Sequence, residues 1–148
     1  MKLANQFDFS SMKKNLNVAI WRYTDSTRNS GGLHISAGEE SKNRFASLLD
    51  FVIENTSGKH ITIDLVDASK DITDVPNFGC NVQSFNKLKL ITTEMPQKIH
   101  INGNDVFFEL SKENFSKISQ CIRSIRSGYE KNIMIEGEVL NFWWQLLK

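Results

Sequence analysis

The sequence has few cysteines, no long apolar run and no apolar N-terminal segment, and each absence removes a class of protein. Its two cysteines, Cys80 and Cys121, show neither the repeated spacing of a zinc site nor the number needed for a disulfide framework, so we expect reduced thiols. No stretch approaches the ~18 apolar residues of a membrane span. Residues 1–15 lack the apolar core of a signal peptide. We therefore expect a soluble, cytoplasmic protein.

A strong net charge is also missing. The formal charge is +1, from 18 basic and 17 acidic side chains, whereas proteins that bind nucleic acid nonspecifically usually carry a basic excess. The adjacent glycines Gly31 and Gly32 lie in a polar stretch without the spaced glycines and Lys-Ser/Thr ending of a phosphate loop. We therefore expect neither a general nucleic-acid-binding surface nor a nucleotide cofactor, and we expect no direct nucleic-acid partner.

The length and composition predict one folded domain. The chain has 148 residues, of which 40% are hydrophobic and 24% charged, as in globular proteins. A chain of this length buries enough surface to fold without disulfides or metals. We predict a single domain spanning residues 1–148, with residues 1–16 as an irregular arm.

Apolar periodicity predicts two helices. Ser36 followed by Glu39 resembles a capping box. It precedes an apolar stripe at helical spacing, formed by Phe45, Leu48, Leu49, Val52 and Ile53. Ser111 similarly precedes a second stripe, formed by Phe115, Ile118, Ile122 and Ile125.

The remaining regular segments are β-branched, aromatic or alternating, which is typical of strands. They cover residues 18–23, 60–66, 82–93, 98–101, 106–110, 131–136 and 139–147. The last is apolar on both faces, so we expect it inside a sheet or covered on both sides. The predicted fold is α+β, with a largely antiparallel sheet, two packed helices and the order β-α-β-β-β-β-α-β-β.

No residue pattern indicates a catalytic or metal site. His34, His60 and His100 are not spaced as metal ligands, and we expect His60 and His100 to face solvent. Cys80 follows Gly79 in a predicted loop, but a nucleophile also needs a nearby base. A small enzyme built from these histidines and Cys80 stays an alternative.

One acidic stretch stands out. Asp64, Asp67, Asp71 and Asp74 occur close together with Lys70 as the one opposing charge. Their spacing differs from that of a calcium loop. A solvated loop is the simplest interpretation, and a docking surface for a basic protein is the functional one.

The second helix carries a basic outer face, formed by Lys112, Lys117, Arg123 and Arg126. Such a face is normally solvated. A nucleic-acid-binding or assembly module that uses it is a further alternative. Trp143 and Trp144 lack interleaved basic neighbours, so we expect core or interface positions for them instead of base stacking.

The last third of the chain, residues 106–147, resembles small bacterial immunity proteins of contact-dependent growth-inhibition and polymorphic toxin systems. The resemblance rests on a strand VFFELS, a helix KENFSKISQCIRSIRSGYE, a strand IMIEGE and an aromatic ending VLNFWWQLL. It implies a protein without catalysis or cofactor that binds the C-terminal domain of a cognate toxin, such as a nuclease, and blocks its active site. Homodimerisation through the two-faced last strand is an alternative.

Overall fold

The computed structural model describes residues 13, 15–24, 32–54, 60–74, 79–94, 96–126 and 131–143. Most of the predicted N-terminal arm lies outside these residues, and so do residues 144–147 of the predicted last strand. Leu16, at the end of the predicted arm, is 4% exposed and belongs to the core. None of the described helices is long and apolar enough to cross a membrane.

The described residues form three helices and nine strands, which confirms the α+β prediction and the order of its elements. Two elements are additional, the strand β2 and the short helix α4, and the predicted strand at 82–93 is divided into two. In chain order the elements are β1 (Val18–Tyr23), β2 (Leu33–Ala37), α3 (Ser41–Glu54), β3 (Ile61–Asp64), α4 (Lys70–Thr73), β4 (Val82–Ser84), β5 (Lys87–Thr92), β6 (Lys98–Asn102), β7 (Asp105–Leu110), α5 (Lys112–Arg123), β8 (Lys131–Ile135) and β9 (Glu138–Phe142).

The strands separate into two sheets, where the sequence predicted one. The five-stranded sheet has the order β4-β1-β2-β9-β8, and the four-stranded sheet has the order β3-β5-β7-β6. Pairing is mostly antiparallel, with β2–β9 and β5–β7 as the parallel pairs. The strand β9 lies between two others, which confirms the internal position predicted from its two apolar faces.

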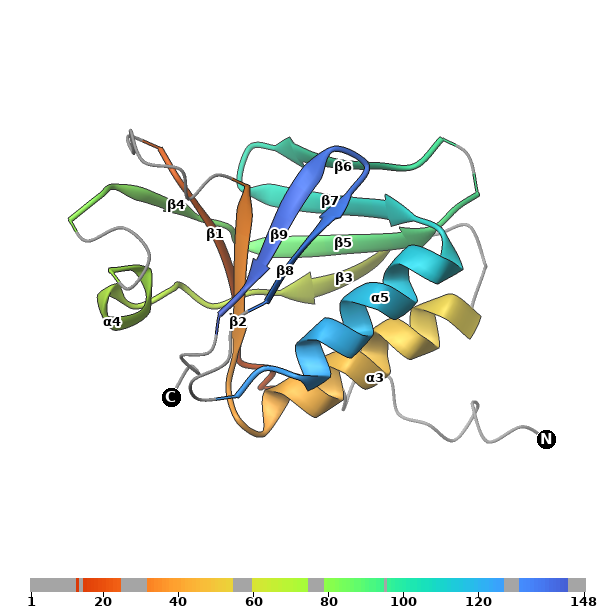
Figure 1. Cartoon of the computed structure of the whole chain (residues 1–148), viewed down its shortest axis with the longest axis horizontal. Helices are drawn as coiled ribbons and strands as arrows, with labels where there is room; N and C mark the ends of the chain where they lie inside the picture. The colour runs from red at the N-terminus through yellow and green to blue at the C-terminus, as the bar shows by residue number, and fades with distance from the viewer. Residues whose placement is uncertain are drawn as a thin grey trace.

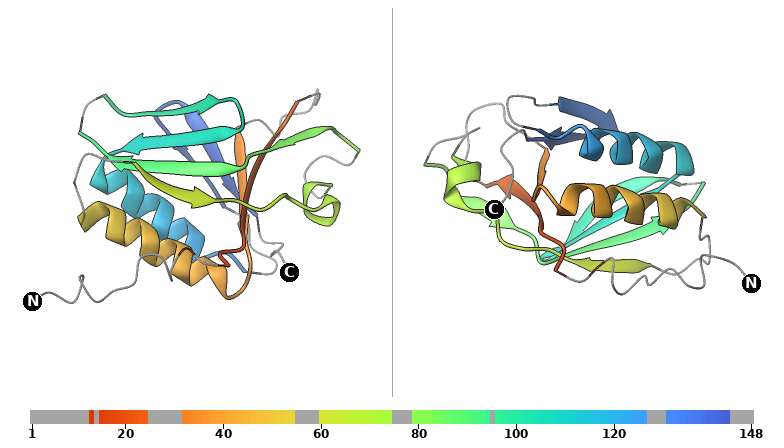
Figure 2. Two further views of the ribbon diagram at one scale, coloured as in Figure 1. Left: turned by 180° about the vertical axis from the view of Figure 1, so that it is seen from behind. Right: turned by 90° about the horizontal axis from the view of Figure 1, so that it is seen from below.

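Helices α3 and α5 run side by side and cover one face of the four-stranded sheet (Figure 1). The view from behind in Figure 2 shows no described helix on its other face. The predicted second stripe is buried, with Phe115, Ile118 and Ile122 in α5 and Ile125 just after its end. Ser111 caps the helix by accepting a hydrogen bond from the Asn114 N–H (3.2 Å). Apolar side chains of α3, α5 and both sheets share one core.

The predicted capping box is wrong. Ser36 lies in β2 and is buried, while α3 begins at Ser41. The Ser41 and Lys42 N–H groups donate to the Gly38 carbonyl (both 3.0 Å). Alternation of Leu33, Ile35 and Ala37 with polar residues is a strand signal, and pairing of β2 with both β1 and β9 overrides the local helix-start motif.

The glycine that precedes β2 is predicted to be essential for the contact between β2 and β9. Gly32 has φ of 82°, and a Cβ there would lie 2.3 Å from the Val139 carbonyl oxygen. Gly137 has a similar φ of 81° but nothing within 4 Å, so it is a matched control. We expect Gly137→Ala to lower the free energy of unfolding by about 1 kcal/mol and Gly32→Ala by ~2 kcal/mol more. Urea titrations that give equal losses would contradict the close approach.

Candidate functional site

The four aspartates predicted as a docking surface lie on one continuous segment, residues 64–74, which runs from the end of β3 through α4. We call it the acidic segment. Three backbone N–H groups fasten it to the sheets: Leu65 donates to Asn86 O (2.8 Å), Val66 to Val18 O (2.9 Å) and Ala68 to Ser84 Oγ (3.0 Å). Ile72 and Thr73 are each 3% exposed. The segment is therefore held in one conformation on the fold.

Two of its four carboxylates already have partners. Asp64 forms an ion pair with Lys87 (Oδ1–Nζ 2.7 Å), and this contact holds the pKa of Asp64 below its usual value. Asp74 Oδ1 accepts a hydrogen bond from the Gly79 N–H (3.3 Å) and lies 3.9 Å from Lys70 Nζ. These two aspartates stabilise the local structure, although Asp64 is largely exposed.

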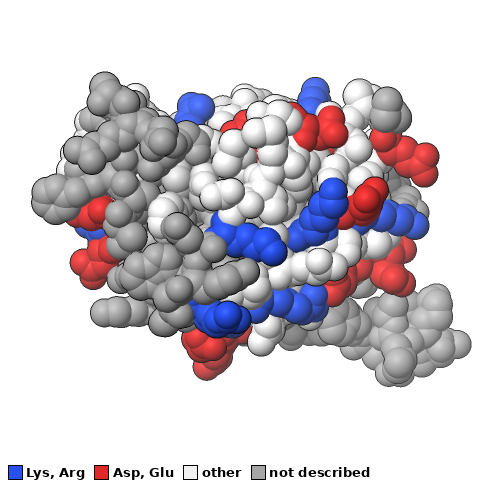
Figure 3. Space-filling model, viewed as in Figure 1, with Lys and Arg blue, Asp and Glu red and all other residues white. Residues whose placement is uncertain are grey.

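Asp67 and Asp71 are exposed, and neither forms an ion pair with any described residue. Val66 beside them is 37% exposed, which is unusual for a large apolar side chain in this structure. Acidic atoms mark the edge of the molecule where α4 lies in Figure 3. The acidic segment thus offers two carboxylates that are not engaged by the described part of the chain, next to an apolar contact point.

A second apolar cluster lies beneath this segment, on the face of the five-stranded sheet that points away from the main core. We call it the outer cluster. Trp21 at 0% exposure and Ile72 of α4 form its centre, with Tyr23 and Trp143 packed against them. His34, which is also fully buried, contacts all three aromatic rings: the centroid distances are 5.6 Å to Trp21, 5.0 Å to Tyr23 and 5.9 Å to Trp143.

The polar atoms of the outer cluster are mostly paired. The Trp143 indole N–H donates to His34 Nδ1 (2.7 Å), and the Tyr23 hydroxyl donates to the Thr73 carbonyl in α4. The buried Trp21 Nε1 has no hydrogen bond of good geometry with a described residue. Burial raises the pKa of Tyr23 to about 12, although the Trp21 N–H opposes the shift; Cys80 and Asp74 add to it. His34 and Cys80 therefore both lie near Tyr23.

His60 and His100 meet on the open face of the four-stranded sheet. Their Nε2 atoms lie 3.7 Å and 2.9 Å from the same Glu109 oxygen, and hydrogen bonding to His100 lowers the pKa of Glu109. Both side chains are partly exposed, at 39% and 35%, as the alternation predicted. The sequence pattern did not reveal that pairing of β6 with β7 and of β3 with β5 would bring these histidines to one carboxylate.

Phe107 stands at the centre of this open face, and its ring is already surrounded. His100 stacks on it (4.6 Å, planes 13° apart), His60 meets its edge (5.5 Å) and Lys89 Nζ lies 5.4 Å from its centroid. Lys89 in turn lies 3.7 Å from Asp105. A nucleobase would have to displace these contacts to stack on Phe107, so the arrangement favours a structural role.

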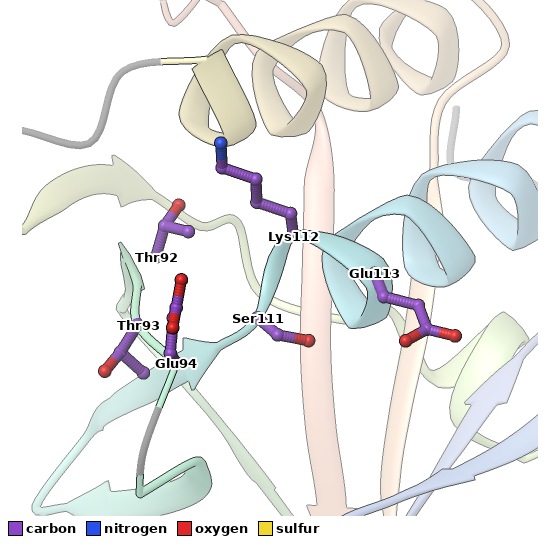
Figure 4. Close-up of a pocket in the computed structure, with 6 residues that line it drawn as sticks. All are labelled: Thr92, Thr93, Glu94, Ser111, Lys112 and Glu113. Carbon is purple, nitrogen blue, oxygen red and sulfur yellow. The ribbon is translucent and has the colours of Figure 1, made fainter.

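A cavity of about 570 Å³ opens between the end of β5 and the start of α5 (Figure 4). Its lining is polar and of mixed charge, formed by Thr92, Thr93, Glu94, Ser111, Lys112 and Glu113. Lys112 extends across it towards the end of α3 in Figure 4. The predicted histidines and Cys80 are not among the residues lining this cavity.

The basic face of α5 is mixed with acidic groups. Arg123 forms an ion pair with Asp50 of α3 (2.8 Å) and also donates to Ser119 Oγ (2.7 Å). Figure 3 shows basic side chains over α3 and α5, with acidic ones between them. Arg123 thus links the two helices.

Both cysteines are free thiols; Cys121 is buried, which raises its pKa, and Cys80 is partly exposed. Within the described ranges, no three His, Cys, Asp or Glu side chains are grouped so that they could hold a metal ion. No protein-family model matches the sequence, and a comparison with curated proteins gives no match.

The anchoring of the acidic segment predicts an alkaline transition. Because the pKa of Tyr23 is raised, the neutral phenol stabilises the folded state fully below pH ~10, and this contribution is lost as the pH rises through about 12. Tyr23→Phe should remove this loss of stability and the late phenolate absorbance, measured by urea unfolding and ultraviolet titration. A wild-type chain whose tyrosines both ionise near pH 10 would contradict the burial of Tyr23.

The Glu109 carboxylate should affect the free energy of unfolding in acid. Its lowered pKa means that the carboxylate stabilises the fold above the usual glutamate pKa, and this stability is lost as the pH falls through the lower folded value. Glu109→Gln should therefore flatten the dependence of unfolding free energy on pH below about 5. Glu113→Gln, an exposed glutamate, is the control. Equal slopes in the two variants would show that the His100–Glu109 contact has no energetic effect.

Proposed function

We propose that this chain is an immunity-type inhibitor, which binds a basic toxin domain stoichiometrically through the acidic segment and performs no chemistry itself. The observation that carries the proposal is the anchored acidic segment. Asp67 and Asp71 are exposed and form no ion pair with a described residue, while the backbone around them is fixed by hydrogen bonds and by the burial of Ile72. The resemblance of residues 106–147 to immunity proteins supports the same function.

The acidic segment is preorganised for binding, because hydrogen bonds already hold its backbone. A binding loop that is already ordered loses little conformational entropy on association. Exposed carboxylates at fixed positions attract a basic surface and select its orientation. The exposed Val66 beside them offers an apolar contact to the same partner. A toxin that acts on nucleic acid needs a basic substrate groove, so an acidic surface can take the place of the phosphates there.

The other functions considered from the sequence have weaker support. An enzyme would need the histidines and Cys80 beside a cavity, and the cavity at α5 is lined by other residues. A nucleic-acid-binding or assembly module on the outer face of α5 would need a continuous basic surface, and Arg123 on that face is paired with Asp50.

Reversal of two charges tests the proposal. Tagged wild-type chain is used to capture its partner from the cells that produce it, and the partner is then expressed in a laboratory host with or without the chain. Asp67→Lys combined with Asp71→Lys should weaken binding by at least about tenfold and abolish protection of the host. Wild-type affinity should also fall with added salt.

The matched control is Glu39→Lys combined with Glu40→Lys, which changes the net charge equally at exposed positions before α3. It should keep wild-type affinity. If both double variants bind alike, the acidic segment is not the interface. If the captured partner is harmless to the host, the chain is not an immunity protein.

A further inference from the structure

The hydrogen bond between Trp143 and His34 fixes the protonation of a fully buried imidazole. An indole N–H can only donate, and it lies 2.7 Å from His34 Nδ1. Nδ1 must therefore carry a lone pair, so the imidazole is neutral with its proton on Nε2. Protonation would place a second N–H at Nδ1, facing the indole N–H. Two donors cannot bond, and the cation must lose this contact.

Loss of the Trp143–His34 hydrogen bond should disturb the packing around His34. The ring is 0% exposed and contacts Trp21 and Tyr23 as well as Trp143. Among the described titratable groups, Cys80 before β4 and Asp74 after α4 act on Tyr23, which contacts His34. The Nδ1–H of a buried imidazolium would face the Trp143 N–H, and it could reach an acceptor only if the aromatic rings moved.

The same neighbours support the acidic segment. Ile72 of α4 packs in the cluster with Trp21, and the Tyr23 hydroxyl donates to the Thr73 carbonyl. Tyr23 also meets His34 edge to face, with planes 80° apart. A shift of the His34 and Trp143 rings is thus transmitted through two contacts to the helix that presents Asp71.

We propose that protonation of His34 releases Trp143 and loosens the acidic segment, so that this docking surface is ordered near neutral pH and weakened in acid. The buried imidazole would then make the order of the acidic segment depend on pH. This pH dependence rests on the proposed function for its biological meaning, whereas the coupling itself is a property of the isolated chain.

Nuclear magnetic resonance of the full chain without a partner tests the coupling. Long-range proton–nitrogen spectra between pH 8 and 5 should show the Nε2–H tautomer of His34 at high pH and its protonation in acid. The Ile72 and Thr73 amide resonances should shift with the same midpoint. A proton on Nδ1 at pH 8, a His34 that stays neutral to pH 5, or amide resonances that do not follow it would overturn the proposal.

Two variants separate this coupling from a merely structural role. Trp143→Phe keeps a ring but removes the donor that favours neutral His34, so it should raise the His34 midpoint by about half to one pH unit. His34→Asn keeps an acceptor near the Nδ1 position but cannot titrate, so it should abolish the amide shifts. An unchanged midpoint in Trp143→Phe would contradict the role of the hydrogen bond, even if His34→Asn fails to fold.

His100→Asn is the matched control, because His100 is a partly exposed histidine on the other sheet. It should leave the His34 midpoint unchanged. These measurements need no partner, so a negative result leaves the docking proposal standing. Conversely, if the partner binds the Asp67→Lys, Asp71→Lys variant with wild-type affinity, the docking function is disproved and the pH coupling is not affected.

Discussion

Burial of both faces of the five-stranded sheet is the constraint on which the structure depends. Along β1, Val18 and Ile20 enter the main core, while Ala19 and Trp21 enter the outer cluster. All four are fully buried. The outer face therefore needs a cover, and α4 supplies part of it through Ile72. Since the acids share the short segment that carries Ile72, the need to cover Trp21 also fixes the position of Asp67 and Asp71.

The amphipathic helices and most strands were predictable because their burial pattern is local. The stripe from Phe115 to Ile122 is buried as its spacing indicates, and the alternation in β7 places Val106 and Phe108 inside. The strand β2 was missed because the Ser36–Glu39 pair resembles a helix start. Its strand character comes from pairing with β1 and β9, which are distant in sequence, and local patterns carry no information about such pairing.

The sequence predicted which residues form the candidate site, but it did not predict their contacts. Clustering of the aspartates was visible in the sequence, but the engagement of Asp64 by Lys87 depends on the pairing of β3 with β5. The link between His34 and Trp143 spans the parallel pairing of β2 with β9. A buried histidine in an unrecognised strand gave no signal of its own. Pairing between strands that are far apart in the sequence therefore determines which polar side chains are engaged within the fold and which stay exposed.

Under the proposed function, a partner covers the acidic segment, which the outer cluster supports. The most direct measurement is amide hydrogen exchange of the chain, alone and saturated with its captured partner, read by mass spectrometry at fixed pH. We predict slower exchange in the complex across residues 65–74, with little change on the open sheet face around Phe107. Protection that maps to Phe107 and its histidines or to α5, with exchange unchanged in residues 65–74, would contradict the account.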